Sequence, residues 1–111
     1  MTDLLAEMRQ CKSVKQCIEL AITDAYDDAE QATAWLTSIQ EILGRFDRVN
    51  VLGQEVVLEG FELANGMAIV AICRQGERKA RVTIDTVAFP DLKPIEALWL
   101  KAWKQFSETY R

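Results

Sequence analysis

The chain has 111 residues, of which 50% are hydrophobic and 27% are charged. A chain of this length can form one domain with its own hydrophobic core, so we expect a single domain over residues 1–111. It holds no run of about 18 apolar residues that could cross a bilayer. Its first residues mix acidic with apolar side chains, unlike a secretion signal. We therefore expect a cytoplasmic protein without a membrane-spanning helix.

The chain contains no histidine and three cysteines. Without an imidazole, Ser-His-Asp and Cys-His catalysis are excluded, and so are zinc sites that need histidine. We expect a protein that is not an enzyme, and any bound metal should be a hard cation held by oxygen atoms. Cys11 and Cys17 would lie about 240° apart on one helix. We expect buried or inert thiols.

Charge is distributed unevenly along the chain, whose net charge is −4. Residues 23–62 carry nine acidic side chains against two arginines, whereas residues 63–104 carry seven basic side chains against four acidic ones. The two regions could pair inside one fold, or the first could leave an acidic face that attracts cations. The overall acidity disfavours nucleic-acid binding.

Two helices are predicted in the first part of the chain. Apolar side chains recur every three or four residues over residues 3–22, which indicates an amphipathic helix. A second helix is predicted over residues 24–43, with Asp24 as its N-cap and Gly44 as its stop. Its buried stripe consists of Ala25, Ala29, Ala32, Leu36, Ile39 and Leu43, with Trp35 and Ile42 alongside.

From about residue 48 the apolar period changes to two, which is typical of β-strands. Strands are predicted over residues 49–51, 56–61, 67–73 and 80–85, with turns at Gly53-Gln54, Asn65-Gly66 and Gly76. The short connections predict an antiparallel meander of three or four strands. Pro94 then fits the first turn of a last helix over residues 94–109. The predicted fold class is therefore α+β, with two N-terminal helices, the meander and a C-terminal helix.

The start of the second helix is a candidate metal site with four acidic residues: Asp24, Asp27, Asp28 and Glu30. Carboxylates at this spacing on one helical turn can converge. Calcium takes about six to eight oxygen ligands, so carbonyls, water or other acids would have to contribute. The other acids considered are Glu55, Glu59 and Glu62. Alternatively, the acids cap the helix and complement its dipole, which contributes about 0.3–1 kcal/mol each.

A family resemblance favours the metal interpretation. The stretch Asp24-Ala25-Tyr26-Asp27-Asp28-Ala29-Glu30, followed by Ala34-Trp35, resembles the opening helix of the cyanobacterial calcium-binding protein family (CcbP-type). The resemblance continues through Val51-Leu52-Gly53, Ala71-Ile72-Cys73-Arg74 and Trp99, over about residues 22–104. Residues 1–22 would then be a helical extension of the region 23–111 that resembles the family.

The resemblance implies a small protein that binds calcium weakly through surface carboxylates and without EF-hands. Asp24, Asp27, Asp28 and Glu30 match the acidic motif and would be the calcium ligands. Arg45 and Arg48 follow the acidic helix and would compete with a cation for these acids.

Two other groups of residues are candidates for a protein interface. Trp99, Trp103 and Phe106 form an aromatic stripe on the last helix, which core packing or a homodimer interface would explain. The basic cluster at Arg74, Arg78, Lys79 and Arg81 is either a solvated edge strand or a surface that docks, chiefly through Arg78 and Arg81, onto an acidic partner or onto the acidic helix of a second copy. We therefore expect a small non-enzymatic binding protein with weak calcium binding. The alternative is a protein-interaction or self-associating module that binds no metal.

Overall fold

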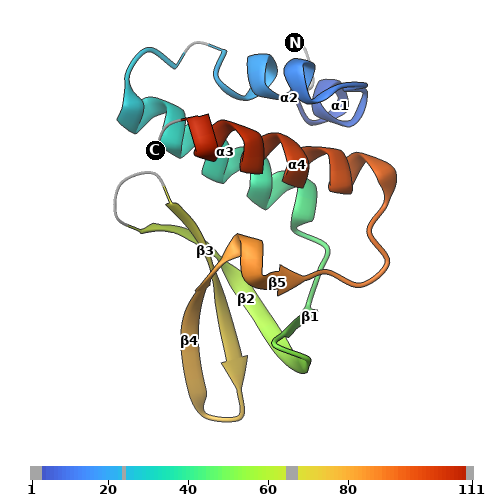
Figure 1. The fold of residues 1–111 in the computed structure, drawn as a ribbon, viewed down its shortest axis with the longest axis vertical. Coiled ribbons are helices and arrows are strands. Elements are labelled where there is room, and N and C mark those ends of the chain that lie inside the picture. The colour runs from blue at the N-terminus through green and yellow to red at the C-terminus, as the bar shows by residue number, and fades with distance from the viewer. Residues whose placement is uncertain (1–3, 24, 65–67, 110–111) are drawn as a thin grey trace.

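The structure is a computed structural model that describes residues 4–23, 25–64 and 68–109. Its elements, in chain order, are α1 (Leu4–Arg9), α2 (Val14–Ala21), α3 (Asp28–Leu43), β1 (Arg48–Val51), β2 (Gln54–Ala64), β3 (Ala68–Gln75), β4 (Arg78–Thr83), a 3₁₀ turn (Ile84–Thr86), β5 (Val87–Ala88) and α4 (Pro94–Thr109). Figure 1 shows three layers, with α3 and α4 lying between the sheet and the pair α1 and α2. The α+β fold class is confirmed.

The helix predicted over residues 3–22 is two helices in the structure. Ser13 Oγ accepts a hydrogen bond from Gln16 N at 3.2 Å, and Gln16 Oε1 accepts one from Lys12 N at 2.7 Å. This reciprocal cap satisfies backbone donors at the start of α2 and so begins a new helix at Val14. The prediction missed the break because apolar residues keep their helical spacing across it.

The second predicted helix is present but begins at Asp28, not at residue 24. Its expected N-cap, Asp24, lies outside the described residues. The helix ends at Leu43, and Gly44 follows with φ −68°, so it is not the left-handed cap that the sequence suggested. Any other residue at this position would clash with the preceding helical turn, because its Cβ would lie 2.6 Å from the Gln40 carbonyl oxygen.

The five strands form one antiparallel sheet in the order β4-β3-β2-β1-β5. The predicted meander of three or four strands is present as β1 to β4, and β5 adds a fifth strand beside β1. A pattern of two residues is too short to predict β5 from its sequence. The pairing of Val51 with Gln54 places the first hairpin turn at Leu52-Gly53, one residue earlier than predicted. The predicted Asn65-Gly66 turn lies outside the described residues.

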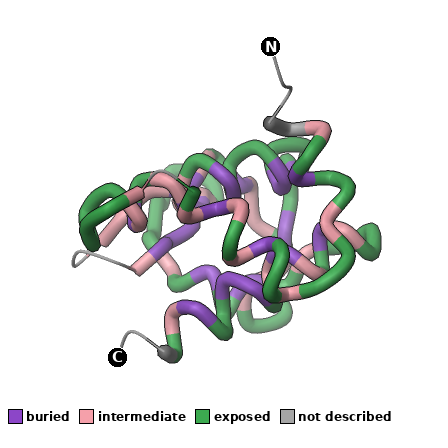
Figure 2. Tube along the Cα trace, turned by 90° about the horizontal axis from the view of Figure 1, so that it is seen from above, coloured by how far each residue is buried: buried purple, intermediate pink, exposed green. Residues whose placement is uncertain are grey.

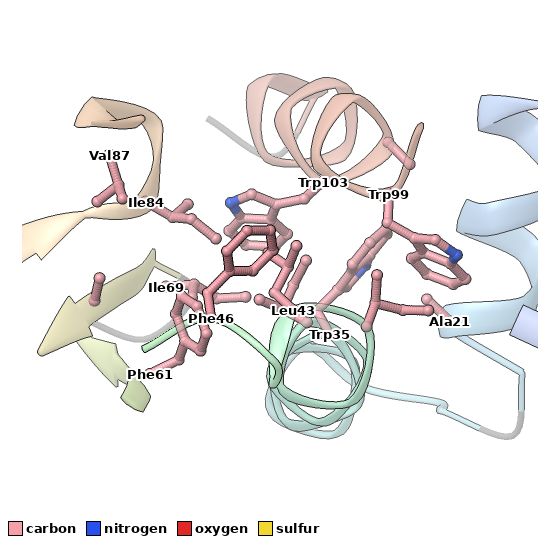
Figure 3. Close-up of a cluster of buried hydrophobic side chains, with 14 of the residues drawn as sticks. Ala21, Trp35, Leu43, Phe46, Phe61, Ile69, Ile84, Val87, Trp99 and Trp103 are labelled. Carbon is pink, nitrogen blue, oxygen red and sulfur yellow. The ribbon is translucent and has the colours of Figure 1, made fainter. Parts of the chain in front are cut away.

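The hydrophobic core centres on an aromatic cluster between α3 and α4 (Figure 3). The ring of Trp35 lies 5.9 Å from that of Trp99, 5.5 Å from that of Trp103 and 5.1 Å from that of Phe106, centre to centre. Along the helices, buried positions alternate with exposed ones, as Figure 2 shows. The core therefore follows the apolar stripes of the two long helices.

The two short N-terminal helices belong to the same core. Met8, Cys17 and Ala21 are buried within the cluster that contains the tryptophans. Trp99 Nε1 also donates a hydrogen bond to the Met8 carbonyl oxygen at 2.9 Å. The helices α1 and α2 thus pack directly against α4. Within the described ranges, no helix has the length and apolar character needed to span a bilayer.

Candidate protein-interaction surface

The acidic residues at the start of α3 form a helix cap. Asp27 Oδ1 accepts a hydrogen bond from Glu30 N at 2.8 Å, and Glu30 Oε2 accepts one from Tyr26 N at 3.3 Å. This is a capping box, in which each side chain satisfies a backbone donor near the helix start. Asp27, Asp28 and Glu30 are all exposed. The capping alternative therefore accounts for Asp27 and Glu30.

Among the described residues, Asp27, Asp28 and Glu30 are not gathered into a metal centre, and the fourth predicted ligand, Asp24, lies outside the described residues. No group of three or more potential metal-ligating side chains lies close enough to hold an ion, as far as the described residues go. The additional acids considered as ligands lie on the sheet, where each is paired with a basic side chain. Arg45 and Arg48, which were expected to compete for the acids, pair with Glu96 and Glu55.

A ladder of ion pairs covers the outer face of the sheet. Glu59 accepts hydrogen bonds from Arg74 Nε at 3.0 Å and pairs with Lys79 Nζ at 3.1 Å, and Arg81 pairs with Glu62. Hydrogen bonds from Lys79 and, as the smaller effect, from Arg74 hold the pKa of Glu59 below its usual value. The acidic and basic regions of the sequence therefore pair within the fold, which is one of the two arrangements expected from the charge distribution.

The aromatic stripe of α4 is part of the core. Trp99, Trp103 and Phe106 are 0%, 3% and 5% exposed, and all three contact Trp35 on α3. A docking surface must be accessible, so this stripe offers no homodimer interface on the folded monomer. Core packing, the alternative left open by the sequence, is what the structure shows.

None of the cysteines is a candidate nucleophile. Burial, together with a smaller effect of the neighbouring Cys11, raises the pKa of the Cys17 thiol to about 12. Burial also raises the pKa of Cys11 and of Cys73. A thiolate is the reactive form of cysteine, so these thiols are held in their inert form at neutral pH.

The sheet has an open apolar hollow of about 360 Å³ on the face that also packs against the helices. We call this hollow the sheet groove and define its floor by Val51, Val56, Cys73, Ala80 and Val82. In Figure 1 the β1–β2 and β3–β4 hairpins extend downward, away from the helical layers. The groove lies at this end of the sheet, where its apolar floor meets solvent.

Leu52 stands at the edge of the sheet groove in a strained conformation. It has φ 51° and Gly53 has φ 79°, as a type I′ turn requires at both central positions. The left-handed conformation costs a residue such as leucine roughly 1–2 kcal/mol. Leu52 is nevertheless 93% exposed, so no packing within the monomer compensates for the strain. Strained residues of this kind are concentrated at functional sites.

Arg78 supplies a positive charge at the same groove. It lies at the start of β4, opposite Gln75, and is exposed. The ion pairs found within the described part of the chain do not include Arg78. Of the two predicted interface cations, Arg81 is thus engaged by Glu62, whereas Arg78 is available to a partner.

The sequence prediction missed Leu52 and the groove. A local signal did exist, because a two-residue hairpin turn normally carries Asn-Gly or Asp-Gly where this chain has Leu52-Gly53.

In comparisons with known proteins, no family model, curated protein or solved structure matched the chain. The function of this chain therefore has to be inferred from its fold and its exposed groove.

Proposed function

We propose that this chain is a non-enzymatic protein-interaction module that binds a protein partner at the sheet groove. The observation that carries the proposal is Leu52, a large apolar side chain that is 93% exposed and held at positive φ beside an apolar hollow. Asparagine or glycine would form the same turn without strain. We infer that a leucine at this exposed, strained position makes contact with another molecule.

The chemistry of the groove indicates what the partner presents. Burying Leu52 against a partner would contribute about 1.5–3 kcal/mol, the range for burial of one leucine side chain. The floor, which includes Val56 and Val82, would accept an apolar side chain of the partner. Arg78 would pair with a carboxylate beside it. The expected partner is therefore a protein segment that combines apolar and acidic residues.

Calcium binding rests on the family resemblance and on the acidic motif. No contact among the described residues favours it, because Asp27 and Glu30 already serve as helix caps. It stays a prediction that is independent of the groove, and the calcium titration in the Discussion tests it.

Peptide selection tests the proposed function without a known partner. Random peptides displayed on phage are selected on the immobilised full-length chain, and the best one is titrated into the isotope-labelled chain by NMR. We expect saturable shifts at Val51–Val56 and at Cys73–Val82. Selection that yields no binder, or a binder whose shifts lie elsewhere, would overturn the proposal.

Two matched substitutions sharpen this test. Ala80→Glu places a charge on the groove floor and should weaken the selected peptide by at least about tenfold, which corresponds to 1.4 kcal/mol. Ala97→Glu is the control, because Ala97 is exposed on α4, away from the groove. Equal binding by both variants would show that the peptide does not use the groove.

A further inference from the structure

The strand β4 is an open edge of the sheet. In the order β4-β3-β2-β1-β5 it pairs with β3 alone, and no other described strand pairs with its outer side. Figure 1 shows β4 as the outermost strand, with no element beyond it. The outer side of an edge strand presents unpaired backbone N–H and C=O groups, to which an extended segment can add as a further strand.

The two faces of β4 differ in chemistry. Ala80 and Val82 lie opposite Cys73 and Ala71 in β3, so they share the face that forms the sheet groove. Residues directly opposite each other in an antiparallel pair point to the same side of the sheet. The intervening residues of β4, Lys79 and Arg81, therefore point to the outer face.

The outer face next to this edge carries an excess of positive charge. Within the described part of the chain, Arg74, Lys79 and Arg81 share two acidic partners, Glu59 and Glu62. The side chains of Lys79 and Arg81 are also 64% and 69% exposed, so a further carboxylate can approach them. Arg78, at the start of the same strand, lies on the groove face with Ala80 and so is separate from this outer-face charge.

This charge selects the occupant of the edge. A second copy of β4 would bring like charges together, which disfavours pairing between two such edges. An acidic strand would instead meet complementary charge along the whole edge. Because side chains alternate along a strand, its acidic residues would face the cations while its apolar residues covered the groove.

We infer that β4 binds an extended partner segment of alternating apolar and acidic residues by β-strand addition, with the apolar side chains lying over the sheet groove. The inference rests on the proposed function and specifies the binding mode and the partner chemistry. Backbone hydrogen bonds along β4 supply affinity, while Ala80, Val82, Lys79 and Arg81 determine which side chains are accepted.

A synthetic peptide tests the binding mode directly. The probe alternates valine and glutamate over six residues, the length of β4, and has blocked ends. Titrated into the isotope-labelled full-length chain, it should give saturable NMR shifts over Arg78–Thr83 and slow the hydrogen exchange of β4 amides that are open in the free protein. A peptide of alternating valine and lysine, and one of alternating glycine and glutamate, should each bind at least about tenfold more weakly, a difference of 1.4 kcal/mol.

A charge-reversed variant supplies a second readout. Lys79→Glu should weaken the valine-glutamate peptide about fivefold, the scale of one exposed ion pair, because Lys79 lies on the outer face that the glutamates would meet. Lys101→Glu is the matched control, because Lys101 is exposed on α4 and does not line the groove. Equal affinity for the lysine peptide, or binding without protection of β4 amides, would overturn strand addition.

The two proposals can fail separately. If peptides selected by phage display bind the groove in an Ala80-dependent way but the valine-glutamate peptide does not bind, strand addition is overturned and the interaction module stands. If neither kind of peptide responds to Ala80→Glu, both proposals are overturned.

Discussion

Replacing Leu52 with asparagine should stabilise the folded chain. Leu52 has φ 51° and is 93% exposed, so the substitution removes backbone strain and loses almost no buried apolar surface. Asparagine adopts the left-handed conformation several times more readily than other non-glycine residues. Since that conformation costs leucine roughly 1–2 kcal/mol and asparagine less, we expect the free energy of unfolding to rise by about 1 kcal/mol.

Urea denaturation and thermal melting measure this change. For a chain of this length, about 1 kcal/mol corresponds to a rise in Tm of roughly 3–5 °C. Leu92→Asn is the matched control, because Leu92 is only 36% exposed and its substitution should lower Tm. If Leu52→Asn left the stability unchanged or lowered it, the turn would not be strained by its leucine, and the main argument for a functional Leu52 would be lost.

Three further predictions concern other parts of the fold. Hydrogen bonds from Arg45 lower the pKa of Glu96. The pair therefore stabilises the protein above the ordinary carboxyl pKa, and this contribution is lost as the pH falls through the lowered value. Glu96→Gln should flatten the fall in unfolding free energy below the ordinary carboxyl pKa, and an unchanged slope in urea denaturation would contradict this. Iodoacetamide at about pH 8 should label the partly exposed Cys11 well before Cys17, as peptide mass spectrometry can show, and equal labelling would contradict the burial of Cys17. Asp27→Ala should lower the free energy of unfolding by about 1 kcal/mol in urea denaturation, through loss of the helix cap. If the acidic segment also binds calcium, millimolar calcium should raise the Tm of the wild type more than that of Asp27→Asn. An equal rise in Tm for both proteins would contradict a site there.

Much of the fold follows from periodic apolar patterns. The stripe of α3 and that of α4, which runs through Trp99 and Trp103, predicted both long helices, and α4 has the predicted range. The break before α2 was missed because a cap depends on one hydrogen bond of Ser13 and not on apolar spacing. The strand β5 was missed because pairing with β1, a long-range contact, defines its two residues.

The site was less predictable, because accessibility depends on tertiary packing. An aromatic stripe has the same sequence pattern in a hydrophobic core as in an interface. The packing of Trp103 and Phe106 against Trp35 shows that these two residues belong to the core. The basic cluster likewise gave no sign that Arg81 would have a partner within the fold while Arg78 would lie at a groove. The groove itself forms where four strands meet, so no single segment encodes it.

The hydrogen bond between Trp99 and Met8 has a consequence for how the protein is made. During synthesis Met8 leaves the ribosome well before Trp99, 91 residues later in the chain, yet the surface that α1 and α2 cover belongs to α4. The apolar side chains of Met8 and Ala21 must therefore wait, without their contacts to α4, until that helix has been translated. Such a delay exposes apolar surface to other molecules. Completion of this core is thereby tied to the synthesis of α4.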